Sequence, residues 1–198
     1  RILLRLAYAL YRPFEQAVLR RAERVLVTSP PYLKASEPLS AWRDKCTVVP
    51  LGIEVNLPSP SQEAHLSPWL PDRLKLLSIG RLAHYKGFET LIRAVSESRH
   101  LQLLIAGQGE DWNRLEALVR SYGIGITQHV QLLGEVSDED KHRLLSTCDA
   151  FCLASNERTE AFGMVLLEAM AHARPCIVTD LPGSGMPWVI SSSNAGIS

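Results

Sequence analysis

The chain has 198 residues, enough for one ordinary domain and part of a second. Hydrophobic residues make up 46% of it and charged residues 21%, a composition typical of a soluble globular protein. The formal net charge is zero, which argues against a protein that binds nucleic acid in general.

The four cysteines are expected to be buried free thiols, because each lies in apolar sequence and none belongs to a matched pair of C-x-x-C motifs. Free thiols fit a cytoplasmic protein. No signal peptide is recognisable, and no apolar run is long enough to span a bilayer. The chain begins at Arg1 and ends at Ser198 without a closing element, so we expect a piece of a longer protein.

Residues 2–22 are predicted to form a helix, with apolar side chains at three- and four-residue spacing. Six arginines against two glutamates give residues 1–24 a charge of +4. One interpretation is an amphipathic helix that packs on a core. The other is peripheral contact with anionic lipid at the cytoplasmic face of a membrane. Pro13 interrupts the run and favours the first interpretation.

Short buried strands are predicted at residues 25–28 and 47–49, with a helical segment at 31–42 between them. Residues 57–71 contain four prolines and three serines. Such a stretch cannot continue a helix or a central strand, so it is predicted to be a linker.

Strands and helices then alternate to the end of the chain. Strands are expected at residues 74–79, 101–106, 130–133, 150–153 and 176–179, and helices at 88–98, 112–122, 137–145 and 163–172. This alternation predicts an α/β fold, a Rossmann-like parallel sheet with helices on both faces. Ligands of such sheets bind beyond the carboxyl ends of the strands, so the loops after the strands are the candidate sites.

The first such loop runs from Gly80 to Gly87 and carries Arg81 and Lys86. Two cations in a loop between a strand and a helix could clamp a diphosphate, but an ordinary solvated loop has the same composition. In the next loop, Gly107 and Gly109 match only part of a dinucleotide fingerprint. They indicate either close approach of a ligand or simply a tight turn.

The loop after residue 153 has the strongest pattern. The amides of Phe162, Gly163, Met164 and Val165 would lie at a helix start, where an anion is favoured. Glu160 precedes that start and Glu168 follows it. As separate residues they read as a charge complementing the helix dipole and a solvated glutamate. Eight helical positions would place them about 12 Å apart, whereas a glycosidase pair needs roughly 5–9.5 Å, so we expect them to contact different parts of one ligand.

The six histidines lack the spacing of a zinc site, and no D-x-D pattern suggests a divalent cation held on phosphates. We therefore expect neither a metal nor a bound cofactor.

Together the loops resemble glycosyltransferase family 4, the retaining, nucleotide-sugar-dependent enzymes of GT-B fold. The resemblance rests on the order and spacing of four motifs: Gly80-Arg81 with Lys86-Gly87, Gly107-Gln108-Gly109-Glu110, Leu133-Gly134-Glu135-Val136, and Glu160-Ala161-Phe162-Gly163 through Glu168-Ala169-Met170. The last is similar to the E-x7-E motif of the family.

The resemblance implies a role for each motif. Arg81 and Lys86 would bind the donor diphosphate, assisted by the backbone of Gly80, Gly107 and Gly109. Glu160 would contact the donor sugar and Glu168 the ribose hydroxyls. The amides of residues 162–165 would meet phosphate and sugar oxygens, and the backbone from Gly134 to Val136 would lie beside the base. A UDP- or GDP-linked sugar would be the substrate.

The resemblance also implies a division of the chain. Residues 1–56 would be the last elements of an N-terminal acceptor domain, residues 57–71 the linker, and residues 72–198 the donor domain. A glycan or lipid-linked acceptor would bind the rest of the N-terminal domain, so no transfer is expected from this chain alone. Two alternatives remain open: a sugar-nucleotide epimerase of GT-B fold, and a non-catalytic binding module.

Two residues depart from the family pattern. Ala161 and Ala173 stand where glycine is common. If residue 173 must adopt a left-handed conformation, alanine costs up to about 1 kcal/mol there.

Overall fold

Six parallel strands form the sheet that positions the candidate loops. In this computed structural model, which describes residues 2–54, 68–193 and 196–197, the strand order is β5-β4-β3-β6-β7-β8. The strands are β3 (Leu74–Ile79), β4 (Leu101–Ala106), β5 (Val130–Gly134), β6 (Ala150–Leu153), β7 (Cys176–Val178) and β8 (Gly196–Ile197). The predicted parallel sheet is confirmed, and β3, β4 and β6 have the predicted bounds.

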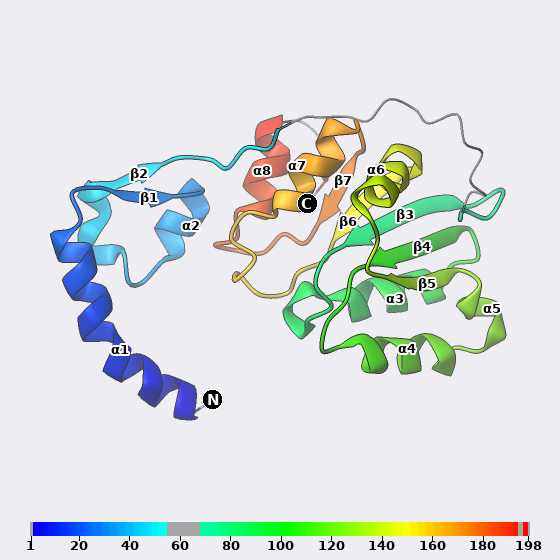
Figure 1. Ribbon diagram of the computed structural model, residues 1–198, viewed down its shortest axis with the longest axis horizontal. Helices are drawn as coiled ribbons and strands as arrows, with labels where there is room; N and C mark the ends of the chain where they lie inside the picture. Colours follow the sequence, from blue (N-terminus) through cyan, green and yellow to red (C-terminus); the bar gives the residue numbers. More distant parts are fainter. Residues whose placement is uncertain (1, 55–67, 194–195, 198) are drawn as a thin grey trace.

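Helices cover both faces of this sheet, as predicted (Figure 1). One face packs on α3 (Phe88–Ser96) and α4 (Trp112–Ser121), the other on α6 (Asp138–Thr147), α7 (Met164–Ala171) and α8 (Met186–Ser193). The short α5 (Ile124–Thr127) precedes β5. Because both faces are covered, the strands carry nearly continuous apolar residues. All four residues of β6 are buried.

Helix α6 begins with a side-chain cap. Ser137 is the N-cap, and its side-chain oxygen accepts a hydrogen bond from the amide of Asp140 at 3.1 Å. This bond fixes where the helix begins after the β5 loop.

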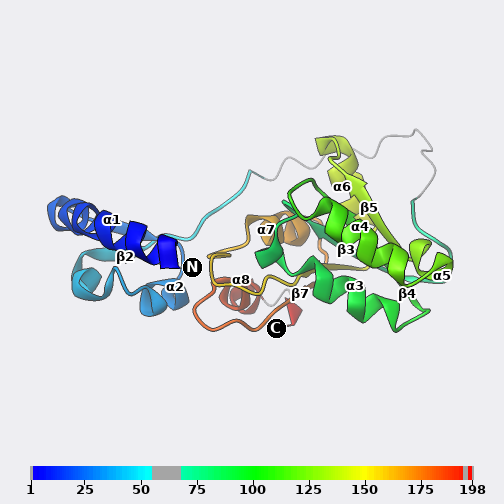
Figure 2. The same cartoon turned by 90° about the horizontal axis from the view of Figure 1, so that it is seen from below.

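A smaller unit, residues 2–48, lies beside the sheet domain (Figures 1 and 2). It contains α1 (Ile2–Arg21), β1 (Val25–Val27), α2 (Pro30–Ala35), the 3₁₀ helix η1 (Ser40–Lys45) and β2 (Cys46–Val48). The helix predicted over 31–42 is therefore wrong in its middle. Helical conformation is disfavoured before a proline, and Pro38 separates α2 from η1.

Strands β1 and β2 pair in parallel, but they are not the buried strands that were predicted. Leu26 is 67% exposed, and β2 has no buried residue. Two strands alone cannot cover their own faces, so local sequence identified the strands correctly and their burial wrongly.

Helix α1 is anchored at its C-terminal end. The ammonium of Lys45 donates to the carbonyls of Arg20 at 2.7 Å and Ala22 at 3.0 Å, and Trp42 Nε1 donates to Gln16 Oε1 at 2.7 Å. The two Lys45 bonds satisfy carbonyls that the end of a helix leaves without partners, and the Trp42 bond holds a side chain of the helix.

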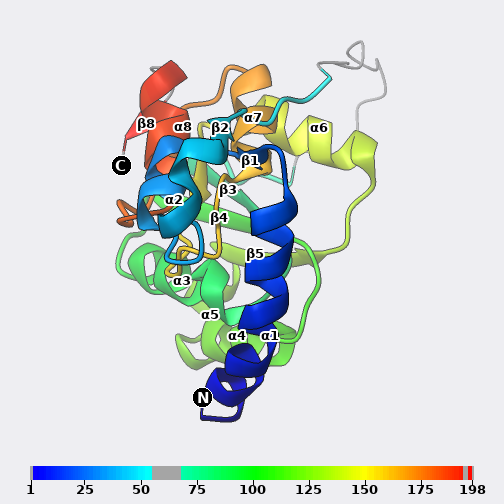
Figure 3. The ribbon, with the colours of Figure 1, turned by 90° about the vertical axis from the view of Figure 1, so that its left-hand side faces the viewer.

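Helix α1 runs along the side of the molecule that faces the viewer in Figure 3. Its apolar stripe is exposed, which corrects the prediction of a core helix. Leu6, Leu10, Phe14 and Val18 recur every four residues and are 62–77% exposed. The periodicity predicts the stripe but cannot say what it packs on.

The predicted linker, residues 57–71, lies largely outside the described residues. Its described end is part of the core: Trp69 is 7% exposed and its Nε1 donates to Thr147 Oγ1 at 2.9 Å. The packed domain thus begins no later than Trp69, three residues before the predicted boundary at 72.

The predicted state of the cysteines is confirmed for three of the four. Cys148, Cys152 and Cys176 are buried free thiols, and Cys46 is half-buried. Burial raises the pKa of Cys148 to about 11 and that of the other two to about 12, so these thiols stay protonated and unreactive.

Candidate active site

The order of the strands places two of the predicted loops side by side. The chain builds outward from β3 to β5 and then returns to β6, on the other side of β3. Ligands bind at such a switch point, at the carboxyl ends of the strands. The loops after β3 and β6 flank it, and they carry Lys86 and Glu160 respectively.

Lys86 and Glu160 form an ion pair there. Lys86 Nζ contacts Glu160 Oε2, and the two side chains are only 12% and 13% exposed. The ammonium also lies 5.4 Å from the centre of the Tyr85 ring. The structure thus joins two residues that the sequence suggested separately, in a setting where water screens charge poorly.

Arg81 takes another direction. Its guanidinium pairs with Glu110, in the loop after β4, at 3.1 Å, and both side chains are more than half exposed. Exposed pairs of this kind contribute little to stability. Arg81 and Lys86 therefore lie in one loop but are held by different carboxylates.

Glycines let the loops after β3 and β4 pack directly on each other. A Cβ on Gly107 would lie 2.0 Å from the Gly80 carbonyl, and one on Gly109 would lie 2.3 Å from the Leu82 carbonyl. The amide of Leu82 donates to Gln108 O at 2.8 Å. The G-x-G pattern is thus explained by contact between two loops.

The third loop joins the same arrangement. The amide of Gly107 donates to Gly134 O at 2.7 Å, at the end of β5. Gly134 itself has a φ of 75°, and Val136 packs against the core on the α6 side. The three glycines predicted to contribute backbone contacts therefore lie together at the carboxyl ends of β3, β4 and β5: Gly80, Gly107 and Gly134.

Helix α7 begins as predicted beside Glu160. Gly163 is its N-cap in a left-handed conformation, with a φ of 81°. Phe162 is buried, while Met164 is exposed. Within the described chain, no hydrogen bond is donated by the amides of residues 162–165, whereas Leu166 donates to Gly163 O at 2.8 Å. Four amides at a helix start are thus available to an anion.

Glu168 lies on α7 and pairs with Lys141 of α6, which sequence reasoning missed. The distance between Lys141 Nζ and Glu168 Oε2 is 3.4 Å. Burial opposes the charge of Lys141, but its bond to Asp138 and the charge of Glu168 outweigh it, so the pKa of Lys141 is raised. The sequence signal that could have identified Lys141 was its position, one turn into the helix that follows the Gly134–Val136 loop.

Two histidines also meet between α6 and the end of α7. His142 Nδ1 lies 2.9 Å from His172 Nε2, and burial together with the neighbouring His142 lowers the pKa of His172. Within the described ranges, no group of three or more potential ligands could hold a metal ion.

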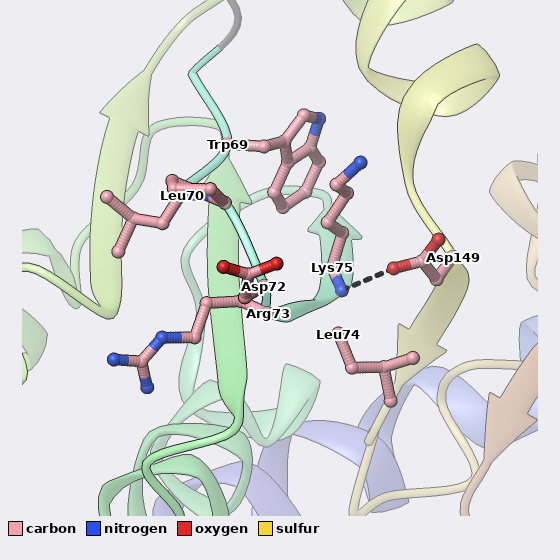
Figure 4. A pocket seen from close by; sticks show the side chains of 8 residues that line it. Trp69, Leu70, Asp72, Arg73, Leu74, Lys75 and Asp149 are labelled. Atoms are coloured by element: carbon pink, nitrogen blue, oxygen red, sulfur yellow. Dashed lines mark hydrogen bonds between the residues drawn. The ribbon is translucent and has the colours of Figure 1, made fainter.

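A cavity of about 510 Å³ lies at the opposite end of the sheet, near the amino ends of β3 and β6 (Figure 4). The amide of Lys75 donates to Asp149 Oδ2 there at 2.8 Å. The cavity is lined by Trp69, Leu70, Pro71, Asp72, Arg73, Leu74, Lys75 and Asp149. None of the predicted site residues is among them.

The sequence of residues 65–197 matches the family described as glycosyl transferases group 1, which is more than half of the chain. The chain belongs to this family. The resemblance and the α/β fold expected from it are therefore confirmed. Among the described residues of this glycosyltransferase chain, no helix is long and apolar enough to cross a membrane.

Curated relatives extend the similarity over almost the whole glycosyltransferase chain. It is 33% identical over 191 residues to O-antigen chain mannosyltransferase C of Escherichia coli, covering 94% of this chain and 49% of that protein. It is 31% identical to D-rhamnosyltransferase WbpZ of Pseudomonas aeruginosa, covering 98% and 50%. The chain thus spans about half the length of the curated relatives it matches.

Solved structures show the same fold. Sucrose-phosphate synthase from Thermosynechococcus elongatus superposes with a TM-score of 0.76 at 27% identity, covering 94% of this chain and 47% of that one. Anabaena HepE in complex with UDP gives a TM-score of 0.69 at 23% identity, covering 85% and 50%. The glycosyltransferase chain therefore has the fold of one half of a GT-B enzyme.

Proposed function

We propose that this chain supplies the donor site of a retaining hexosyltransferase. The enzyme would transfer a hexosyl group from a UDP- or GDP-linked sugar to a glycan or lipid-linked acceptor. The observation that carries the proposal is the Lys86–Glu160 pair at the switch point of the sheet, beside the free amides that begin α7. Cation, carboxylate and amides are the groups that a nucleotide-sugar needs.

The roles follow from the charges. Lys86 and Arg81 would bind the diphosphate and stabilise the negative charge that develops on the leaving nucleoside diphosphate. Glu160 would then turn from Lys86 to the hydroxyls of the sugar. Glu168 would accept hydrogen bonds from the ribose, beside Lys141. The backbone of Gly134 to Val136 would lie along the base.

The ion pairs make binding an exchange of partners. Glu160 neutralises Lys86, and Glu110 neutralises Arg81. A diphosphate offers each cation a stronger partner, because its charge is larger and its oxygens can bind a guanidinium in two places. Donor binding would therefore free Glu160 at the moment when the sugar arrives.

One relative supports a glycan acceptor, since it is named an O-antigen chain mannosyltransferase, and the name of the other, a rhamnosyltransferase, supports transfer of a sugar. Because these proteins are about twice as long, we propose that polypeptide beyond these 198 residues binds the acceptor. Residues 1–56 would be the end of that acceptor domain. The chain alone would then bind the donor without transferring its sugar.

Peripheral contact with the cytoplasmic face of a membrane is part of the proposal. It is supported by the exposed apolar stripe of α1 and by the arginines of residues 1–24. An in-plane helix buries such a stripe at the lipid boundary while its arginines meet anionic head groups.

Calorimetric titration of the chain with UDP, GDP and ADP tests the donor site. One of the three is expected to bind. Lys86→Ala should weaken the diphosphate at least tenfold and the bare nucleoside by less than about twofold, because only the diphosphate meets the ammonium. Glu168→Ala should weaken both about fivefold through the ribose.

Lys75→Ala is the matched control, because it removes a lysine at the opposite end of the sheet. It should leave every affinity unchanged. Absence of binding by a folded wild-type chain would rule out the donor site and favour a non-catalytic module. Product analysis of the intact protein separates the epimerase, which needs no acceptor.

A further inference from the structure

Glu160, the residue proposed to contact the sugar, lies on a loop whose backbone is held by a later segment of the chain. Glu160 lies between β6 and α7, in irregular backbone. Ser184 Oγ donates a hydrogen bond to the Glu160 carbonyl at 2.6 Å, and the amide of Gly185 donates to Ala161 O at 3.0 Å. Ser184 is 2% exposed. The backbone at Glu160 is therefore held by a buried hydroxyl 24 residues further along the chain.

The loop around Ser184 has little freedom of its own. Its hydroxyl also accepts a hydrogen bond from the amide of Met186 at 3.3 Å, which ties it to the first turn of α8. A Cβ on Gly185 would lie 2.2 Å from Ala161 O and 2.9 Å from Ser29 Oγ. Only a residue without a side chain fits between the Glu160 loop and the N-cap of α2.

The other end of this loop touches α2 as well. A Cβ on Gly183 would lie 2.5 Å from the Cβ of Ala35. Arg158, two residues before Glu160, donates from Nη1 to the carbonyl of Ala35 at 2.8 Å. Residues 183–185 thus fill the space between α2 and the Glu160 loop. The smaller unit, residues 2–48, thus contacts the loop that carries Glu160.

We propose that Ser184 is a positioning residue for Glu160, which keeps the carboxylate where the donor sugar arrives. The inference deepens the proposed function and rests on it. Without the hydroxyl, the Glu160 carbonyl loses its buried donor and the loop gains freedom, while Arg81 and Glu168 keep their partners Glu110 and Lys141, and Lys86 pairs with the diphosphate once the donor is bound. The defect should therefore concern the sugar and spare the nucleotide.

The test compares a nucleotide-sugar with its nucleoside diphosphate in the full 198-residue chain. The pair is UDP-glucose with UDP, or GDP-mannose with GDP, whichever base binds. Ser184→Ala should raise the ratio of the two dissociation constants about fivefold, the loss expected for one neutral hydrogen bond. The dissociation constant for the diphosphate alone should change less than about twofold.

Glu160→Gln should shift the same ratio in the same direction, and the double variant should shift it no further than Glu160→Gln alone, because both changes act through one contact. Ser191→Ala is the matched control. It removes another serine hydroxyl that donates to a carbonyl, on α8 and away from Glu160, and should leave the ratio unchanged. Ser184→Cys, with a weaker donor of similar size, should give a smaller shift.

Equal weakening of both ligands by Ser184→Ala, or additive effects in the double variant, would overturn the positioning role while leaving the donor site intact. An unchanged ratio in Glu160→Gln would remove the sugar contact on which the role depends. A wild-type chain that binds no nucleotide would instead overturn the proposed function itself.

Discussion

Single residues in the candidate site differ mainly in how well water reaches them. Lys86 and Glu160 are nearly buried, so their attraction is strong, whereas Arg81 and Glu110 are exposed and their pair is weak. Sequence spacing singled out Arg81, Lys86, Glu160 and Glu168 as charged loop and helix residues. It could not show which cation meets which carboxylate, because Lys86 and Glu160 are 74 positions apart.

Ala173 gives the clearest prediction for a single residue. Its φ is 54°, a left-handed conformation that is unfavourable for any residue with a Cβ. Ala173→Gly is expected to raise the free energy of unfolding by about 0.5–1 kcal/mol. Urea denaturation followed by circular dichroism would measure it.

Ala94→Gly is the matched control for this substitution, because Ala94 lies inside α3 at an exposed position. There the same exchange should lower the free energy of unfolding by about 1 kcal/mol. A loss of stability at both positions would contradict the conformational explanation for residue 173.

At the scale of elements, the sheet and its helices follow closely from sequence. Long apolar runs with regular alternation define β3, β4 and β6 to the residue. The prediction of one helix over 31–42 was wrong because Pro38 interrupts it, although the residues on either side favour helix. The packing of the loops after β3 and β4 on each other could not be predicted from the sequence. A glycine indicates that there is little room for a side chain, but it does not identify the residue that occupies the space.

That packing predicts the effect of Gly107→Ala. A Cβ there would meet the Gly80 carbonyl at 2.0 Å, and the φ of 133° adds backbone strain. The variant is expected to lose about 2 kcal/mol or more of unfolding free energy. Gly125→Ala in α5, where a Cβ meets nothing within 4 Å, should be neutral. Equal thermal shifts of the two variants would refute the contact as the cause.

At the scale of the whole molecule, local patterns identify elements but not what covers them. The apolar stripe of α1 and the strands β1 and β2 have the composition of buried elements, yet Leu10 is 77% exposed and Leu26 67%. Burial depends on polypeptide or surfaces that no local window contains. The two curated relatives are about twice as long as this chain. Their additional polypeptide is one candidate for what covers α1, β1 and β2.

The stripe supports a prediction about lipid. The chain should co-sediment with vesicles rich in phosphatidylglycerol and not with phosphatidylcholine vesicles, because binding needs both the apolar face and the arginines. The double variant Leu10→Asp, Phe14→Asp should abolish binding. Its unfolding free energy should stay within about 0.5 kcal/mol, since both side chains are exposed. Equal sedimentation of wild type and variant would argue against a membrane role for α1.

The glycine contacts between the first two loops also bear on how this site can change. Gly107 and Gly109 leave no space for a side chain at either position, so substitution there lowers stability as well as changing the site. The exposed side chains of Glu135 and Glu139, between β5 and the first turn of α6, have no such restriction. A library meant to alter the preferred nucleotide should therefore vary these two positions and keep the two glycine-bearing loops constant.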